Sequence, residues 1–194
     1  WFPFLIAALL AGAGCSRDPQ VAARKYLESG NRYFNNGKYN EASIMYRSAL
    51  KKYPMFGEGY YRLGLTFLKQ NNFAASERAL RRAFELLEKK GGPELEDTTS
   101  KLSDIYLLAY LTDTRRSKSS EVGFNDFLGR LKENSFDRLR LEAYQAWRAK
   151  DLDTAQAKFE AAAKVKPRDP NLELAYAQVL MAKNRFEDAE RIVL

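Results

Sequence analysis

The residue types that carry most enzyme chemistry are nearly absent from this chain. It has one cysteine, Cys15, and no histidine, so the commonest general base and metal ligand is missing. A single cysteine excludes an internal disulfide and a cysteine-rich zinc site. Serines and threonines are present, but without histidine they cannot form a Ser-His catalytic pair. These counts favour no class of enzyme, and we expect no catalytic residues, no cofactor and no metal.

Two groups of residues could suggest a catalytic or phosphate-binding site, but a structural role explains each of them better. Glu187, Asp188 and Glu190 stand close together, but they fall at the start of a predicted helix, where negative charge complements the helix dipole. The Gly91-Gly92 pair does not predict a phosphate-binding loop, because no strand precedes it and no Gly-Lys-Ser/Thr sequence follows it. Pro93 follows, so this pair predicts the end of a helix.

Cys15 follows an apolar segment. Residues 1–14 contain no charged side chain. As a helix they would span only ~21 Å, which is short of the ~30 Å hydrocarbon core of a bilayer. The segment therefore favours the apolar core of an export signal, and an uncleaved membrane anchor is the alternative. A basic leader is expected to precede Trp1.

The residues around Cys15 resemble the lipobox of bacterial lipoproteins. Small residues, Ala11 to Gly14, precede the cysteine and a polar stretch follows it, with Gly12 where the family prefers leucine. The resemblance implies cleavage before Cys15, a lipid anchor on that cysteine, and export to the bacterial envelope, at the outer membrane or periplasmic face. Residues 1–15 would form the signal and lipobox, and residues 16–22 a polar spacer. The alternative is an incidental buried cysteine.

The rest of the chain repeats one order of large and small residues. In residues 23–56, Gly30, Ala42 and Ala49 are small, as required where paired helices approach to about 8–10 Å, and Tyr26, Tyr33 and Tyr46 are large. Three further stretches show the same order of sizes in register. Their matching residues are Tyr60, Leu63, Gly64, Phe67, Phe73, Ser76, Leu80 and Ala83; Leu139, Ala143, Ala146, Leu152, Ala155, Phe159, Ala162 and Pro167; and Tyr176, Ala177, Leu180, Phe186, Ala189 and Val193.

This order of sizes resembles the tetratricopeptide repeat family. The resemblance implies an all-α fold, a right-handed superhelical solenoid of helix-turn-helix repeats whose apolar faces are buried by their neighbours. Residues 23–56 and 57–90 are the first two repeats, residues 136–169 a later one, and residues 170–194 a repeat that the end of the chain cuts short. A solenoid needs a polar terminal cap, and none is visible, so we expect further repeats or another domain to follow.

Residues 91–135 are less regular and are interpreted as one degenerate repeat with insertions. Leu102, Ile105, Tyr106, Ala109 and Tyr110 predict a first helix through their spacing of three and four residues. A second helix is predicted from Phe124, Phe127, Leu128 and Leu131. The polar and basic residues from Thr112 to Ser120 lie between the two. They predict a loop, either a tolerated surface insertion or a docking site.

The family resemblance also implies where a partner would bind. Tetratricopeptide repeats hold peptides or partner helices against the first helix of each repeat. Counted from each repeat start, nine positions are expected to face that groove, unless they are simply exposed helix residues. They are Leu27, Asn31 and Asn35; Tyr61, Leu65 and Lys69; and Arg140, Tyr144 and Arg148. Their aromatic, amide and cationic side chains suit a peptide with some acidic character.

The sequence therefore predicts a non-catalytic scaffold at the bacterial envelope that binds a protein or peptide partner. One alternative is the recruiting arm of a larger enzyme or regulatory protein. A second is a nucleic-acid-binding helical repeat, prompted by the net charge of +7 and by pairs such as Arg81-Arg82 and Arg115-Arg116. Export and the scatter of the positive charge along the chain argue against that alternative, so no nucleic acid is expected.

Overall fold

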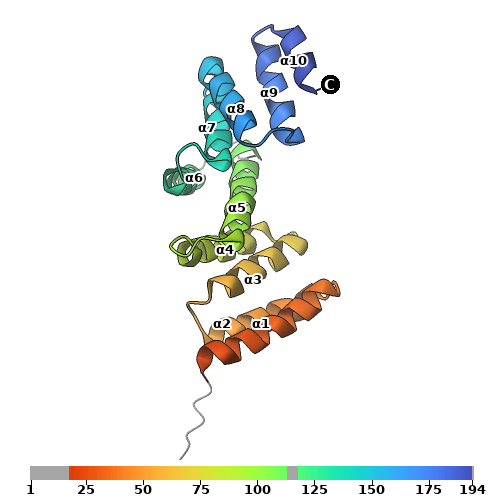
Figure 1. Cartoon of the computed structure of the whole chain (residues 1–194), viewed down its shortest axis with the longest axis vertical. Helices are drawn as coiled ribbons and strands as arrows, with labels where there is room; N and C mark the ends of the chain where they lie inside the picture. The colour runs from red at the N-terminus through yellow and green to blue at the C-terminus, as the bar shows by residue number, and fades with distance from the viewer. Residues whose placement is uncertain (1–17, 113–117, 194) are drawn as a thin grey trace, which may run out of the picture.

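The computed structural model describes residues 18–112 and 118–193, and these contain ten α-helices and no strand (Figure 1). The predicted all-α solenoid is confirmed. The helices are α1 (Pro19–Asn35), α2 (Tyr39–Lys52), α3 (Gly57–Lys69), α4 (Phe73–Leu87), α5 (Pro93–Thr112), α6 (Lys118–Arg130), α7 (Phe136–Arg148), α8 (Leu152–Val165), α9 (Pro170–Ala182) and α10 (Phe186–Val193).

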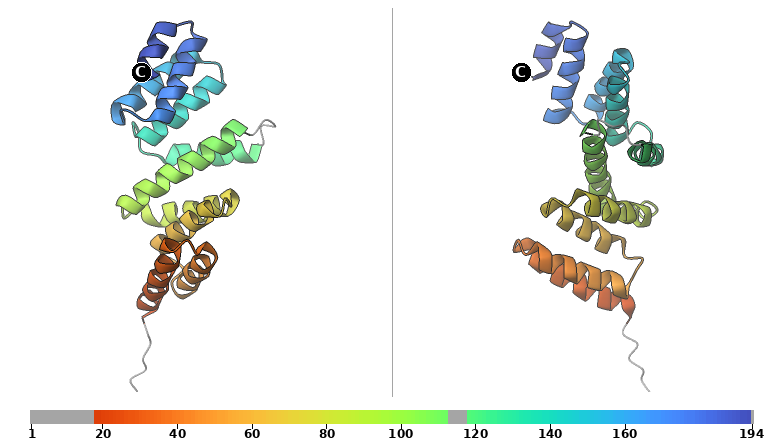
Figure 2. Two further views of the ribbon diagram at one scale, coloured as in Figure 1. Left: turned by 90° about the vertical axis from the view of Figure 1, so that its right-hand side faces the viewer. Right: turned by 180° about the vertical axis from the view of Figure 1, so that it is seen from behind.

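Consecutive helices form hairpins that stack along the long axis of the molecule. The pairs α1–α2, α3–α4, α7–α8 and α9–α10 follow one another from the N-terminal to the C-terminal end (Figures 1 and 2). The pair α5–α6 departs from this pattern, because α5 has 20 residues and α6 lies to one side of the stack (Figure 1). This irregular pair is the interval that the sequence predicts as a degenerate repeat.

Helix α1 begins four residues before residue 23, the predicted start of the first repeat. Asp18 caps it by accepting a hydrogen bond from the backbone N–H of Gln20 at 2.9 Å, and Pro19 occupies the first helical turn. Residues 19–22, which were assigned to a polar spacer, are therefore helical. The predictions for residues 1–17 and for most of the loop around Arg115-Arg116 lie outside the described residues.

The turn inside each regular pair has the same backbone conformation. Gly37, Asn71, Lys150 and Asn184 all have a positive φ, between 55° and 71°. They occupy equivalent positions, because Asn71 follows Gly37 by 34 residues and Asn184 follows Lys150 by 34 residues. Glycine and asparagine tolerate this left-handed conformation, whereas lysine adopts it at a cost. The repeat register is thus visible in the backbone itself.

Close helix approach explains the small residues. A Cβ placed on Gly30 would lie 2.5 Å from the ring of Tyr46, and one on Gly64 would lie 2.6 Å from the side chain of Leu80. Ser76 takes the place of alanine in the second repeat, and its hydroxyl donates a 2.9 Å hydrogen bond to the carbonyl oxygen of Gly64. The buried serine therefore has a partner, and its hydroxyl carries no desolvation penalty.

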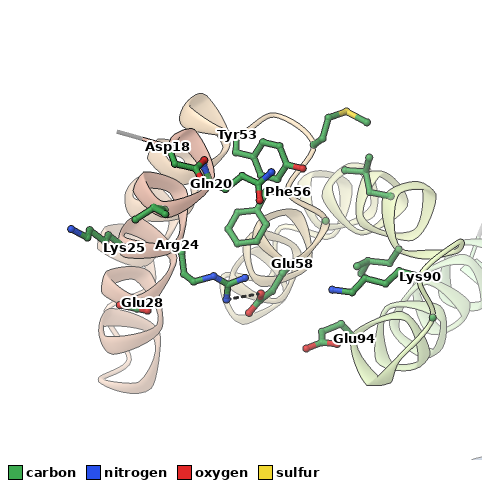
Figure 3. Close-up of a pocket in the computed structure, with 16 residues that line it drawn as sticks. Asp18, Gln20, Arg24, Lys25, Glu28, Tyr53, Phe56, Glu58, Lys90 and Glu94 are labelled. Atoms are coloured by element: carbon green, nitrogen blue, oxygen red, sulfur yellow. Dashed lines mark hydrogen bonds and ion pairs between the residues drawn. The ribbon is translucent and has the colours of Figure 1, made fainter. Parts of the chain in front are cut away.

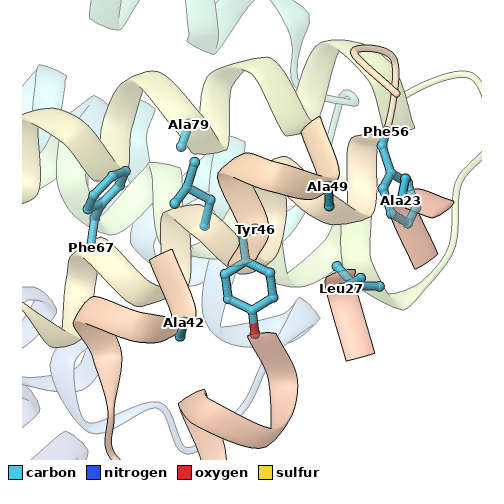
Figure 4. Close-up of a cluster of buried hydrophobic side chains, with 9 residues drawn as sticks. Ala23, Leu27, Ala42, Tyr46, Ala49, Phe56, Phe67 and Ala79 are labelled. Atoms are coloured by element: carbon cyan, nitrogen blue, oxygen red, sulfur yellow. The ribbon is translucent and has the colours of Figure 1, made fainter. Parts of the chain in front are cut away.

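Buried side chains form a core that runs through the stack. In the first two pairs the core includes Tyr46 and Leu27, which are 0% and 2% exposed (Figure 4). In the irregular pair, α6 is held by Phe124, Phe127 and Leu131, which pack against residues of α4 and α5. The ring of Phe127 lies 5.0 Å from that of Tyr106 and 5.6 Å from that of Phe84. Aromatic contacts thus hold the helix that departs from the repeat geometry.

Candidate partner-binding groove

The first helices of three successive pairs, α5, α7 and α9, line a groove of about 400 Å³. We call it the α5–α7–α9 groove. Helix α5 contributes Leu107, Leu108 and Leu111; helix α7 contributes Arg140, Tyr144 and Trp147; and helix α9 contributes Leu174 and Gln178, among others. The groove forms where α5, which continues to Thr112, packs against α7, and side chains of α9 complete its lining.

The rim of this groove is apolar and exposed. Leu108, Leu111 and Leu174 are 47%, 50% and 56% exposed, which is high for large aliphatic side chains brought together in one cavity. Tyr144 is buried, with its ring 5.8 Å from that of Trp147 and 5.3 Å from that of Phe159 in α8. The aromatic floor is therefore fixed by the core, while the leucines are free to contact a partner.

An ion pair between a buried arginine and an exposed aspartate joins the first two helices of the groove. Arg140 of α7 donates to Asp104 of α5 at 2.9 Å and to Asp137 of its own helix at 3.3 Å. Burial raises the pKa of the Asp137 carboxyl above its ordinary value, and the positive charge of Arg140 opposes this rise. Asp104 stays 54% exposed, so the groove presents one carboxylate beside its leucines.

The structure brings two of the nine predicted groove residues together in this cavity, namely Arg140 and Tyr144. Arg148, one turn further along α7, donates to the carbonyl oxygen of Tyr110, and its guanidinium lies 4.4 Å from the centre of that ring. It therefore links α7 to the end of α5. Arg148 thus belongs to the interface between α5 and α7, and it does not line the groove.

The six predicted residues of the first two repeats do not line the α5–α7–α9 groove. Leu27 belongs to the core, so it is left out of any partner surface. Asn31 accepts a 2.7 Å hydrogen bond from Tyr46, and Tyr61 donates one of 3.0 Å to Asp97 of α5. These two side chains are thus engaged between helices. Leu65 is half-buried, and the remaining two, Asn35 and Lys69, are exposed.

Sequence reasoning missed the contributions of α9 and α5, for different reasons. Leu174 and Gln178 follow Arg140 and Tyr144 by 34 residues, so extending the same register by one repeat would have found them. Leu108 and Leu111 lie in the irregular interval, where no register was available. Only their place on a long apolar helix could have drawn attention to them.

A second cavity, of about 670 Å³, lies where the first turns of α1, α3 and α5 converge (Figure 3). Its lining mixes both charges with aromatic side chains. Arg24 of α1 faces Glu58 of α3 at 3.8 Å, and its guanidinium lies 5.8 Å from the centre of the Phe56 ring (Figure 3). The opposite charges largely balance here, so this cavity shows no clear preference for a charged ligand.

Among residues 18–112 and 118–193, no group of three histidine, cysteine, aspartate or glutamate side chains is placed to hold a metal ion. Within the same ranges, every helix falls short of the length and apolar character that crossing a bilayer requires.

Family models for the tetratricopeptide repeat match two parts of the chain, residues 27–87 and residues 146–194. Together these matches cover more than half of the sequence. They include the first two helix pairs from the middle of α1 onward, and the last two pairs from the end of α7 onward. No curated protein sequence matches the chain.

Solved structures with similar folds are tetratricopeptide repeat proteins and related solenoids. MamA from Desulfovibrio magneticus aligns with a TM-score of 0.63 at 11% identity, over 88% of this chain and 90% of that one. A thermophilic TPR protein from Thermus thermophilus aligns with 0.55 at 21%, over 88% of each chain. YrrB, a TPR protein with an unusual peptide-binding site, aligns with 0.59 at 16%, over 88% and 82%. At these identities the likeness concerns the fold.

Proposed function

Because this chain is a tetratricopeptide repeat protein, we propose that it is a non-catalytic scaffold of the bacterial cell envelope that holds a protein partner in the α5–α7–α9 groove. Proteins of this family generally act as interaction scaffolds, and the single observation that carries the finer proposal is the groove itself. Three exposed leucines and a fixed aromatic floor come from three helices that are far apart in the sequence.

The chemistry of the groove indicates what the partner presents. Half-exposed leucines gain most by being covered with apolar side chains, at roughly 25 cal/mol for each Å² removed from water. The carboxylate of Asp104 and the amide of Gln178, which also lines the groove, offer hydrogen bonds to a backbone at the edge. An apolar stripe of a partner helix or an extended apolar peptide fits this surface. YrrB, a different protein with a similar fold, has an unusual peptide-binding site, so a peptide is one kind of ligand that this fold can hold.

The proposed location rests on the sequence before the helices. The uncharged segment of residues 1–14 and the small residues before Cys15 support export and a lipid on that cysteine. Metabolic labelling with a lipid precursor tests this part separately. Label should enter the wild-type protein and be lost in Cys15→Ser, and label that persists in the variant would reject the anchor at this site.

The groove is tested by matched substitutions of equally exposed residues. Leu174 in the groove and Ile44 on α2 are both 56% exposed, and Ile44 lies away from all three groove helices. Affinity capture from envelope extracts of the source cells should recover a partner with the wild type and with Ile44→Asp, but not with Leu174→Asp. Equal recovery by the two variants would reject the groove as the binding site, provided both keep the wild-type helical content.

A further inference from the structure

The N-terminal end of the solenoid carries a second surface that the proposed groove does not use. Helices α1 and α2 run antiparallel, so the last turn of α2 comes beside the first turns of α1. A cavity of about 600 Å³ lies between them and is lined by Val21, Lys25 and Tyr26 from α1 and by Lys51 and Lys52 from α2. We call these five residues the N-terminal basic edge.

None of the lysines of this edge forms a salt bridge within the described part of the chain, although Lys25 also borders the second cavity, which holds carboxylates. All three are exposed, and no salt bridge among residues 18–112 and 118–193 includes any of them. The one carboxylate in the lining is Asp18, which already accepts the capping hydrogen bond from Gln20. Lys51 and Lys52 complement the C-terminal dipole of α2, but Lys25 lies in the second turn of α1, where the helix dipole does not favour a positive charge. Interaction with the helix dipoles therefore does not by itself explain why these three lysines lie together.

The apolar members of the edge are also exposed. Val21 is 53% exposed and Tyr26 is 36% exposed. Lysines with long apolar stems, a tyrosine and an aliphatic side chain on one surface form the composition that is typical of a membrane–water interface. There the lysine ammonium groups contact lipid phosphates, and the tyrosine ring lies at the level of the headgroups.

The position of the edge in the chain favours a lipid surface over an acidic protein. Cys15 precedes the helix cap Asp18 by only three residues, which span at most about 11 Å when extended. Since α1 begins at Pro19, no long spacer separates that cysteine from the basic edge. A lipid on Cys15, which is part of the proposed function, would bring this edge to the bilayer, and the charge argument holds without that lipid.

We infer that the N-terminal basic edge docks on the anionic surface of a phospholipid bilayer through Lys25, Lys51 and Lys52, with Val21 and Tyr26 at the headgroup level. The contact orients the solenoid with α1 and α2 at the membrane and the α5–α7–α9 groove further away along the stack (Figure 1). The groove then stays open to a partner that is not itself buried in the bilayer.

Vesicle binding by the full chain tests this inference. The probes are vesicles of phosphatidylcholine alone and vesicles that also contain phosphatidylglycerol, and the readout is the ratio of the two affinities, which removes any contribution from apolar insertion. Lys51→Gln with Lys52→Gln should lower this ratio by roughly 25-fold, because each lysine near an anionic surface contributes about fivefold. Lys51→Arg with Lys52→Arg keeps the charge and should keep the ratio.

A control pair of lysines distinguishes an effect of this surface from an effect of the net charge of the protein. Lys132 and Lys150 are exposed, lie far along the stack from α1, and enter no salt bridge within the described ranges. Lys132→Gln with Lys150→Gln removes the same charge and should leave the ratio unchanged. The inference would be overturned if the affinity ratio fell equally in both double glutamine variants. It would also be overturned if wild-type binding did not depend on phosphatidylglycerol. Partner capture by the groove that contains Leu174 should be the same in the wild type and the three double variants. A negative result for membrane binding is therefore distinct from a negative result for the proposed groove.

Discussion

Gly64 in α3 lies directly against Leu80 in α4, so that a Cβ at the glycine would be 2.6 Å from two carbon atoms of the leucine side chain. Leu80 is fully buried and cannot move into solvent. The contact sets how closely the two helices of the second repeat approach. It is also the contact that the repeated pattern of small and large residues predicts.

Gly64→Ala should therefore lower the free energy of unfolding by about 1–3 kcal/mol, because overpacking outweighs the better helix propensity of alanine. Urea unfolding followed by circular dichroism measures the change. Gly129 in α6 is the control, since a Cβ there meets no atom within 4 Å. Gly129→Ala should be neutral or stabilising by up to about 1 kcal/mol. If Gly64→Ala were as stable as the control, it would contradict the close packing of Gly64 against Leu80.

Lys150 offers a stabilising substitution. It is the one lysine among the four equivalent turn residues, with φ of 65° at a position where the others are glycine or asparagine. Lys150→Gly should raise the unfolding free energy by about 0.5–1 kcal/mol, because the strain of a side chain in the left-handed region exceeds the extra entropy of glycine in the unfolded chain. Ala157→Gly, at an exposed position inside α8, should lower it by about 1 kcal/mol. Destabilisation by both changes would contradict the assigned turn.

The stability of the first repeat should fall at alkaline pH. Burial raises the pKa of the Tyr46 hydroxyl from its ordinary value of 10.0 to about 12. A raised folded-state pKa gives stability that is complete below the unfolded value of about 10 and is lost as the pH rises through 12, by roughly 3 kcal/mol in total. Tyr46→Phe removes the ionisable group and should make the fall in unfolding free energy above about pH 10 less steep.

Asn31→Ala is the matched control for this prediction. It removes the same 2.7 Å hydrogen bond between α1 and α2 but keeps the buried hydroxyl. Both variants should lose about 1 kcal/mol at neutral pH, and only Tyr46→Phe should flatten the alkaline limb. An identical pH dependence in the two variants would show that Tyr46 does not ionise during alkaline unfolding.

The regular repeats could be predicted from the sequence because each depends on local spacing. Gly30, Ala42 and Ala49 have to be small where helices approach, and the turn glycine recurs as Asn71 and Asn184 at a fixed interval. The irregular pair could not be placed in the same way. Helix α6 is positioned by aromatic contacts such as Phe127 with Phe84, between residues 43 apart in the sequence, and no repeat register encodes such a contact.

The candidate groove was predictable only in part, for the same reason. Arg140 and Tyr144 follow from the repeat register and were identified. Leu27 occupies the position equivalent to Arg140 in the first repeat, but its side chain belongs to the hydrophobic core with Phe56 and the alanines of α2 and does not line the groove. Leu108 and Leu111 enter the groove because α5 is long, which is a feature of the irregular interval and not of the repeat.

Site-specific photo-crosslinking tests the central claim most directly. A photoreactive amino acid placed at Leu108 or Leu174, on opposite sides of the groove, should give adducts with the same partner in source cells. The same amino acid at Ile44, which is exposed to the same extent as Leu174 but lies on α2, should give none of that adduct. Adducts of one partner at both groove positions and not at Ile44 are the predicted result. Adducts at Ile44 alone, or different partners at Leu108 and Leu174, would contradict the claim that the α5–α7–α9 groove holds a single protein segment.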